Sequence, residues 1–300
     1  IIYVNLLTWP VASIGWISSI IQQAEASQKR INEFLNEKSE ITNFNPNDTS
    51  NILWEITFNN VNYKYKETGI AATNNINFSI KSIGKLGITG GTGSGKSTLM
   101  NLLCRLYDID DGEILIDNIP IKEINLNSLR KQIGYVPQDT FLFSDTIMNN
   151  IKFGIENATR DEVIKACKTA AIHNEISNFE KGYDTILGER GINLSGGQKQ
   201  RISIARALIK KPKILILDDC LSAMDTQTEE LILKSLESYT KNISTIIISH
   251  RISSIKNTNN IIVLENGGII QSGTHNQLIS QNGYYKQLYN KQIIKKESIK

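Results

Sequence analysis

A glycine-rich loop constrains the fold of this chain more than any other stretch. Residues 90–98 read Gly-Gly-Thr-Gly-Ser-Gly-Lys-Ser-Thr and fit the nucleotide-binding pattern G-x-x-x-x-G-K-[ST], with Gly90, Gly95, Lys96 and Ser97 at the fixed positions. Four glycines in six residues would weaken a helix or a strand, so a close approach of the backbone to a ligand must account for them. The stretch therefore predicts a phosphate-binding loop.

The chemistry of such a loop predicts ATP and Mg²⁺ as its cofactors. Backbone amides in the middle of the loop can converge on phosphate oxygens, Lys96 can bridge the β and γ groups, and the Ser97 hydroxyl can ligate Mg²⁺. The residues predicted to bind the nucleotide here are Gly90, Gly91, Thr92, Gly93, Ser94, Gly95, Lys96, Ser97 and Thr98.

The flanks of the loop support this prediction. Residues 85–89 are a short strand candidate, and Leu99, Leu102, Leu103 and Leu106 recur at i, i+3, i+4 and i+7, which marks one buried face of a helix. An ordinary glycine-rich turn would rarely match the pattern and also stand between a strand and a helix.

The composition limits the class of protein. A chain of 300 residues suits one large domain or two modest ones, and 33 basic against 30 acidic residues leave no basic excess, which argues against nucleic acid as a partner. Cys104, Cys167 and Cys220 are widely spaced and lack the spacing of a metal site, so they are expected to be reduced, cytosolic thiols.

The start of the chain predicts a membrane helix. Residues 1–21 contain no charged side chain and would reach roughly 30 Å as a helix, the thickness of one bilayer core. A signal peptide and a soluble core helix are the alternatives, but a signal peptide should begin with a basic stretch. Lys29 and Arg30 favour a cytoplasmic location for the end of the segment.

The remaining organisation follows from changes in pattern. The predicted units are a membrane helix with a cytoplasmic extension at 1–42, a linker at 43–51 rich in Asn, Asp and Pro, a nucleotide-binding domain at 52–292 and a tail at 293–300. Residues 52–80 show the period of two that is typical of strands, and helical periodicity around 161–171 belongs to a predicted helical subdomain at about 141–210. The expected fold is therefore α/β, a P-loop NTPase core with an antiparallel β subdomain and a helical subdomain.

Several side chains at strand ends are candidates for the site. Tyr65 can stack on adenine or pack within the sheet, and the local sequence favours packing. Gln138 follows a strand candidate at 133–136 and can orient a metal-bound water. The apolar run 213–217 ends in Asp218 and Asp219, the pattern of a central parallel strand whose carboxyl end meets ligand, and Asp218 is the predicted Mg²⁺ partner of Ser97.

Two further patterns extend the site. A strand candidate ends at His250, whereas His173 and His275 lack that context and are expected to be solvated or capping residues. Residues 194–198 open a helix in which Ser195 can cap, and the glycines after it expose amides at a positive helix N-terminus, which predicts a second anion site.

Together these stretches resemble the ATP-binding cassette (ABC) transporters, specifically half-size exporters of the multidrug and lipid type. The run Leu-Ser-Gly-Gly-Gln at 194–198 matches the family signature. The resemblance assigns adenine stacking to Tyr65, water and metal positioning to Gln138, and sensing of the γ-phosphate to His250. It also implies that residues 188–191 touch the membrane domain and that residues 222–225 form the D-loop. The residues that it implies contact the nucleotide of an opposing subunit are Ser195, Gly196, Gly197 and Gln198.

The departures from the family pattern bear on function. The pattern places a glutamate, the candidate general base, where this chain has Asp219, and the loss of one methylene withdraws the carboxylate by about 1.5 Å. Cys220 and Leu221 replace the usual Ala-Thr, and Gly91 replaces a common proline, which is conformationally permissive.

The resemblance implies a function for the whole chain. It predicts an ATP-hydrolysing subunit of an exporter in the plasma membrane, with its nucleotide-binding domain on the cytoplasmic side, and the chain is expected to be a C-terminal fragment lacking five membrane helices. The predicted partners are a second half-transporter, the membrane and an exported substrate, with a heterodimer favoured over a homodimer because the signature is intact but Asp219 is short. A regulatory half that binds ATP with little hydrolysis and a soluble ABC ATPase are the alternatives.

Overall fold

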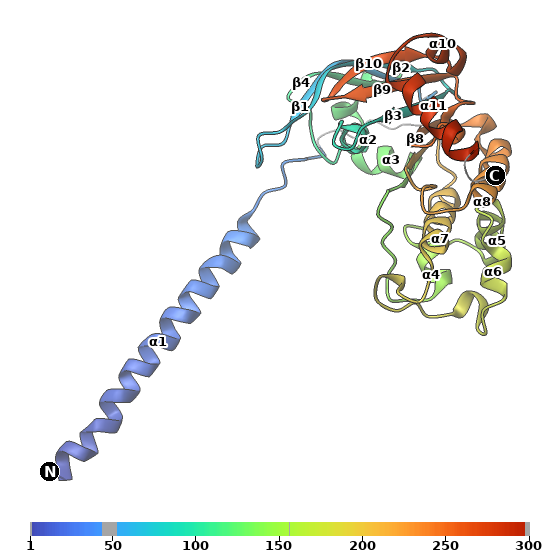
Figure 1. The fold of residues 1–300 in the computed structure, drawn as a ribbon. Helices are drawn as coiled ribbons and strands as arrows, with labels where there is room; N and C mark the ends of the chain where they lie inside the picture. Colours follow the sequence, from blue (N-terminus) through green and yellow to red (C-terminus); the bar gives the residue numbers. More distant parts are fainter. Residues whose placement is uncertain (1, 44–52, 156, 298–300) are drawn as a thin grey trace. The chain divides into compact units, whose positions relative to one another are not determined.

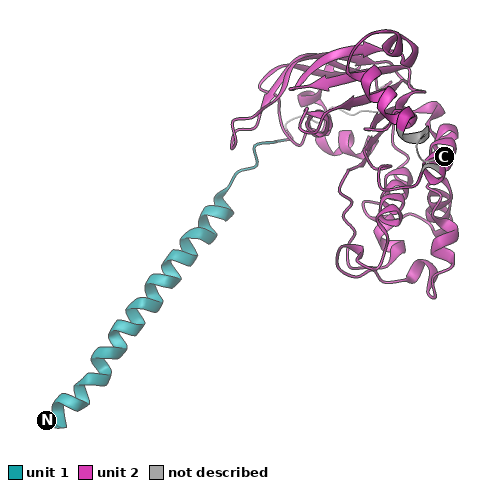
Figure 2. Ribbon diagram, in the orientation of Figure 1, with its two compact units in different colours: residues 1–42 teal, residues 43–300 magenta. Residues whose placement is uncertain are grey.

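The computed structural model describes residues 2–43, 53–155 and 157–297 (Figure 1). It divides the chain into two compact units, residues 1–42 and 43–300 (Figure 2). Apart from residue 43, the predicted linker at 43–51 lies outside the described residues, as do residues 298–300 of the predicted tail.

The first unit contains one long helix, α1 (Ile2–Asn36), which continues past Leu35 as predicted. It is long and apolar enough to cross a membrane, with a mean hydropathy of 1.4 over its most apolar 18 residues. Two of its hydroxyls bond to the carbonyls of their own helix, Thr8 to Val4 at 3.1 Å and Ser13 to Pro10 at 2.8 Å. These polar side chains are therefore compatible with an apolar environment.

The second unit begins with the predicted antiparallel subdomain. Its sheet has the order β2-β1-β4-β5 and is formed by β1 (Ile56–Lys64), β2 (Ala71–Ile80), β4 (Asp111–Ile116) and β5 (Ile119–Pro120). The two strand candidates at 56–58 and 61–65 are one strand, because the pairing with β2 continues across a register shift between Phe58 and Val61. Asn60, inside that shift, has a φ of +49°.

A six-stranded sheet forms the centre of the second unit. Its order is β10-β9-β3-β8-β7-β6, and every neighbouring pair is parallel except β9 with β10. The strands are β3 (Lys85–Gly90), β6 (Ile133–Val136), β7 (Ile214–Asp218), β8 (Ser244–Ile248), β9 (Asn260–Glu265) and β10 (Gly268–Gly273). β7 and β8 are buried along their whole length, and their apolar stretches are Ile-Leu-Ile-Leu at 214–217 and Ile-Ile-Ile at 246–248.

Helices cover this sheet and form the predicted helical subdomain. The α-helices are α2 (Lys96–Leu103), α3 (Leu126–Gln132), α4 (Ile147–Lys152), α5 (Arg160–Thr169), α6 (His173–Ser177), α7 (Gly196–Ile209), α8 (Thr226–Tyr239), α9 (Ile252–Ile255), α10 (His275–Ser280) and α11 (Tyr284–Glu297). Helix α11 extends into the residues assigned to the tail. Helices α4 to α7 lie within residues 141–210 and are grouped together in Figure 1.

Two hydrophobic cores lie against the parallel sheet, and strand β7 contributes to both. Ile214 and Ile216 belong to the core shared with the antiparallel sheet and α2, whereas Leu215 and Leu217 belong to the core shared with α7 and α8. This alternation is the period of a strand that is buried on both faces. The sheet is therefore fixed from both sides, which holds the ends of its strands in place.

Some expectations about single residues were wrong. Leu106 does not continue the buried face of Leu99, Leu102 and Leu103, because α2 ends at Leu103 and Leu106 is 46% exposed. His173 and His275 are half-buried and do not cap a helix, since Ile172 and Thr274 are the N-cap residues of α6 and α10. Each ring accepts or donates a hydrogen bond through Nδ1 to a buried tyrosine hydroxyl, Tyr183 at 2.9 Å and Tyr285 at 2.7 Å.

Candidate functional site

The residues that follow four parallel strands meet at one edge of the central sheet. Strands β3, β6, β7 and β8 run in the same direction, so their carboxyl ends lie together. A cavity of about 310 Å³ lies at this edge. The predicted site residues that line it are Tyr65, Thr92, Gly93, Ser94, Gly95, Lys96, Ser97, Thr98, Gln138, Asp218, Asp219 and His250.

The loop glycines are required at the two positions where other backbone comes closest. A Cβ at Gly95 would lie 2.2 Å from the carbonyl oxygen of Ala72, and a Cβ at Gly90 would lie 2.2 Å from that of Leu264. Gly95 also has a φ of +95°. At Gly91, by contrast, a Cβ would meet open space, in keeping with a permissive position.

Lys96 lies across the loop that precedes it. Its ammonium donates to the carbonyls of Gly90 at 3.1 Å and Gly91 at 2.7 Å. Burial lowers the pKa of Lys96, while the charges of Asp218 and Asp219 raise it. The ammonium therefore points into the loop between the backbone amides and the two carboxylates, where a phosphate oxygen would replace the carbonyls as its partner.

Asp218 is held by two hydroxyls. Ser97 bonds to its carboxylate, and Tyr135 donates to Oδ2 at 3.1 Å. Burial raises the pKa of Asp218, whereas these two hydrogen bonds and the charge of Lys96 lower it. The sequence analysis did not identify Tyr135 as a site residue. Its position in β6, the strand that leads to Gln138, could have indicated that its hydroxyl lies near the site.

The Ser97 and Asp218 pair fits a magnesium ion that arrives with a nucleotide. Mg²⁺ prefers oxygen ligands and keeps several waters or phosphate oxygens, so one hydroxyl and one carboxylate suffice from the protein. Among the described residues no group of three or more His, Cys, Asp or Glu side chains could hold a metal. The donor set is thus the one that a nucleotide-bound Mg²⁺ needs.

Asp219 is buried beside this pair with one oxygen unsatisfied. The residue is 8% exposed, and its Oδ1 has no hydrogen-bond partner in the described structure. Its backbone has a φ of +44° and its N–H donates to Ile248 at 2.9 Å, which ties the acid to the strand that leads to His250. Asp219 also lines the cavity, and a carboxylate at such a place is suited to accept a proton from water.

Tyr65 packs against other aromatic rings and also lines the cavity. Its ring packs edge-on against Tyr63 and Tyr107, with centroids 5.1 and 5.6 Å away, and its hydroxyl bonds to Thr98 Oγ1 at 3.0 Å. It also lines the cavity. The packing holds the ring in place while leaving part of it available to a base.

The signature residues lie away from this cavity, since none of them lines it. Ser195 caps α7 by accepting from the N–H of Gln198 at 3.2 Å, and the Gln198 side chain accepts from the N–H of Ser195 at 2.9 Å. The amide of Gln198 also donates to Glu175 at 3.0 Å. Ser195 and Gly196 are exposed, so the amides at this helix N-terminus are accessible to a ligand from outside the chain.

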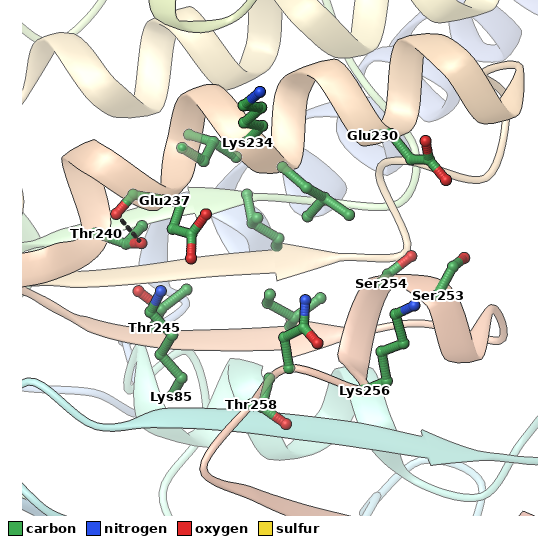
Figure 3. Close-up of a pocket in the computed structure, with 15 residues that line it drawn as sticks. Lys85, Glu230, Lys234, Glu237, Thr240, Thr245, Ser253, Ser254, Lys256 and Thr258 are labelled. Atoms are coloured by element: carbon green, nitrogen blue, oxygen red, sulfur yellow. Dashed lines mark hydrogen bonds between the residues drawn. The ribbon is translucent and has the colours of Figure 1, made fainter. Parts of the chain in front are cut away.

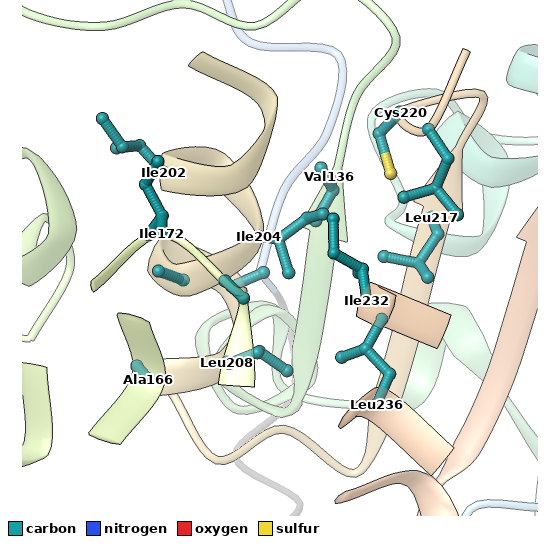
Figure 4. Close-up of a cluster of buried hydrophobic side chains, with 14 of the residues drawn as sticks. Val136, Ala166, Ile172, Ile202, Ile204, Leu208, Leu217, Cys220, Ile232 and Leu236 are labelled. Carbon is teal, nitrogen blue, oxygen red and sulfur yellow. The ribbon is translucent and has the colours of Figure 1, made fainter. Parts of the chain in front are cut away.

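One hydrophobic core positions both the acidic strand end and the signature helix (Figure 4). It contains Val136, two residues before Gln138, and Leu217, one residue before Asp218. Ile204 and Leu208 of α7 pack in the same core, as does Cys220, which is fully buried. Burial also raises the pKa of the Cys220 thiol, so this departure from the family pattern serves packing.

A second cavity of about 330 Å³ lies between α8 and strands β7 and β8 (Figure 3). Its wall includes Leu233 and Leu236 of α8 and the lysines Lys85 and Lys256. None of the predicted site residues lines it. The nucleotide chemistry therefore belongs to the cavity at the phosphate loop.

Comparison with known proteins agrees with this geometry. The family model described as ABC transporter matches residues 73–222. The chain is 44% identical over 295 residues to the uncharacterized ABC transporter ATP-binding protein YfiB of Bacillus subtilis (strain 168), covering 97% of this chain and 50% of that protein. It is 41% identical over 287 residues to the multidrug resistance-like ATP-binding protein MdlA of Escherichia coli (strain K12), covering 96% of this chain and 48% of that protein.

A solved structure extends the likeness to three dimensions. The structure of a bacterial Atm1-family ABC exporter with ATP bound superposes with a TM-score of 0.85 at 37% identity, and the match covers 97% of this chain and 51% of that one. The chain thus spans about half the length of the curated relatives it matches.

Proposed function

The chain belongs to the ABC transporter family, and on that premise we propose that it is the ATP-hydrolysing half of a membrane exporter. The observation that carries the proposal is the single cavity that brings together the phosphate loop, the acids after β7 and His250. The apolar helix α1 and the exporters among the relatives support a place in the membrane, with the nucleotide-binding unit on the cytoplasmic side. They do not favour a soluble ABC ATPase.

The residues of the chain divide the reaction between them. The loop amides and Lys96 bind the triphosphate, and the ring of Tyr65 meets the adenine. Ser97 and Asp218 would hold Mg²⁺ with Gln138 near them, and the ion would neutralise charge on the phosphates. Asp219, which lines the cavity, would accept a proton from the attacking water, and His250 would contact the γ-phosphate. Positioning and charge stabilisation supply most of the catalysis in such a reaction.

We also propose that the signature serves a second subunit. Ser195 and Gly196 are exposed and do not line the chain's own cavity, so the N-terminus of α7 would meet a nucleotide held by a partner. ATP bound between two subunits would close the dimer, and hydrolysis would release it. This closure would couple hydrolysis to export.

A heterodimer is the form of this assembly that we propose. Asp219 weakens the site built on this chain's phosphate loop, whereas the intact signature would complete the partner's site. A signature that completes only another weakened site would have little use. The second candidate, a half that binds ATP with little hydrolysis of its own, rests on the same residue, Asp219.

The proposed function is tested on Lys96. Lys96→Ala in the full-length exporter should weaken ATP binding by about tenfold or more and stop hydrolysis, because the loop loses its charge-assisted bonds to the phosphates. Lys81→Ala, which changes an exposed lysine outside the cavity, is the control and should match the wild type. Equilibrium ATP binding and phosphate release measure the two effects. Unchanged binding and turnover in Lys96→Ala would remove the proposal.

A further inference from the structure

A side chain from the last helix holds the backbone on both sides of Arg251, next to the proposed γ-phosphate sensor. The amide of Gln292 donates through Nε2 to the carbonyl of His250 at 2.7 Å and accepts through Oε1 from the N–H of Ile252 at 3.0 Å. We propose that Gln292 is a positioning residue for His250. The inference rests on the proposed function, since it concerns the same ATP site.

Helix α11 holds Gln292 next to residues 250–252 because one face of the helix packs against the hydrophobic core. Tyr285 is fully buried, and Leu288 and Tyr289 pack against the same core. With Gln292 these residues are spaced i, i+3, i+4 and i+7, so all four lie on one side of the helix. The amide is therefore presented by an anchored helix, so its two hydrogen bonds restrain the segment that they join.

The segment is held on its other side by the side chain of Arg251. Its guanidinium donates to the carbonyls of Met224 at 3.0 Å and Ser222 at 2.8 Å, both in the proposed D-loop. It also pairs with the buried Glu229 at 2.5 Å. The backbone of residues 250–252 thus lies between two sets of contacts, and Gln292 supplies the set that acts on the main chain directly.

This geometry predicts a role in turnover and not in affinity. The direction of the imidazole depends on the backbone of His250, and a displacement on the order of 1 Å at a catalytic group lowers rates by about a hundredfold. Most of the residues proposed to bind ATP lie elsewhere, at Tyr65 and the phosphate loop. Loss of the Gln292 bonds should therefore lower kcat and leave ATP binding unchanged.

The first test uses the full-length exporter with its partner. Gln292→Ala should reduce kcat by roughly tenfold, as a partial displacement of His250 would. ATP affinity should stay within about twofold of the wild type, because the contacts of Tyr65 and of the phosphate loop are kept. Gln292→Glu should behave similarly, because a carboxylate accepts from Ile252 but cannot donate to His250. Gln287→Ala, an exposed glutamine on the same helix, is the matched control and should leave kcat unchanged.

A double-mutant cycle separates positioning from a general loss of stability. In a His250→Ala background, Gln292→Ala should cause no further fall in kcat, because the group that it positions is absent. An equal further fall would overturn the inference, as would an unchanged kcat in both Gln292 variants.

Hydrogen exchange supplies a readout that needs neither ATP nor Mg²⁺. In Gln292→Ala, the amide of Ile252 should exchange at least about fivefold faster, the effect of losing one hydrogen bond. Unchanged exchange over residues 249–255 would contradict the claim that the two hydrogen bonds of Gln292 restrain this segment. Lys96→Ala, measured in parallel, keeps the two claims apart. Unchanged ATP binding in Lys96→Ala contradicts the proposed function. A fall in kcat that Gln292→Ala also causes in the His250→Ala background contradicts only the positioning role.

Discussion

Two opposing requirements act on Asp219 at the scale of the residue. Its φ of +44° is a backbone conformation that short polar side chains tolerate better than long ones. Its role as a proton acceptor would be served better by the longer glutamate, whose carboxylate reaches about 1.5 Å further. Asp219 nevertheless lines the cavity, and its Oδ1 is buried without a hydrogen-bond partner. As the proposed base, the short acid would therefore be placed at the cavity but less well aligned than a glutamate.

Tyr65 provides a prediction at the same scale. Tyr65→Ala should weaken ATP binding by about 1–3 kcal/mol, the range for lost stacking on a base, whereas Tyr65→Trp should retain it. Tyr63→Phe is a control, since it keeps the aromatic packing around Tyr65 and alters no residue of the cavity wall. Titration of ATP against the purified exporter measures these affinities. Equal affinities for the Ala, Trp and wild-type proteins would return Tyr65 to a packing role.

Helices α10 and α11 act as one element through a hydrogen bond between His275 and Tyr285. Burial, aided by the charge of Lys256, lowers the pKa of His275 in the folded protein. Folding therefore favours the neutral ring, and the docking should be fully stable above the ordinary histidine pKa of about 6.5. It should weaken as the pH falls from there toward the lower pKa of the folded state, because protonation favours the undocked form.

The expected loss of docking at low pH can be measured on helix α11. Hydrogen exchange over residues 284–292, corrected for intrinsic rates, should accelerate between pH 7.5 and pH 5.5 in the wild type. His275→Gln should remove most of that acceleration, since it has no proton to bind. His173→Gln is the matched control, because His173 of α6 makes the comparable bond to Tyr183 and its replacement should leave the behaviour of α11 unchanged. A pH response that persists in His275→Gln would assign it to another group.

The proposed assembly sets the predictions at the scale of the whole molecule. With a partner that carries glutamate at the matching position, the two ATP sites should differ, since Asp219 serves one and the signature at 194–198 serves the other. Changing the partner's glutamate to glutamine should nearly stop hydrolysis, because a general base contributes on the order of a hundredfold to ten-thousandfold. Asp219→Asn should have a much smaller effect on steady-state phosphate release.

The Asp219→Glu variant is the control for this experiment, and two outcomes would contradict the asymmetric assembly. Asp219→Glu restores the missing methylene and should raise turnover at this chain's own site or leave it unchanged, but should not lower it. The asymmetric assembly is wrong if Asp219→Asn stops turnover as completely as the partner's change. It is also wrong if the chain purifies as an active homodimer.

The local parts of the site were predictable from the sequence. The phosphate loop, the acids after an apolar strand and the capped helix at Ser195 each depend on residues within about ten positions of one another, where spacing directly reports backbone conformation. The parallel strand β7 was predictable for the same reason, as a strand buried on both faces carries an unbroken apolar run. These patterns, with the signature, were enough to predict the fold class and the family.

The contacts between distant segments were decided only by the tertiary structure. Tyr135 reaches Asp218 across 83 positions and Gln292 reaches His250 across 42, and neither residue belongs to a local pattern that predicts a partner. The end of α2 at Leu103, which leaves Leu106 exposed, likewise departs from the helical spacing that the sequence continues. Periodicity reports which face of an element is buried, but strand order and helix docking set what that face meets. For that reason the chain's sequence determined the groups that carry the chemistry, and its tertiary structure decided which side chains hold them in place.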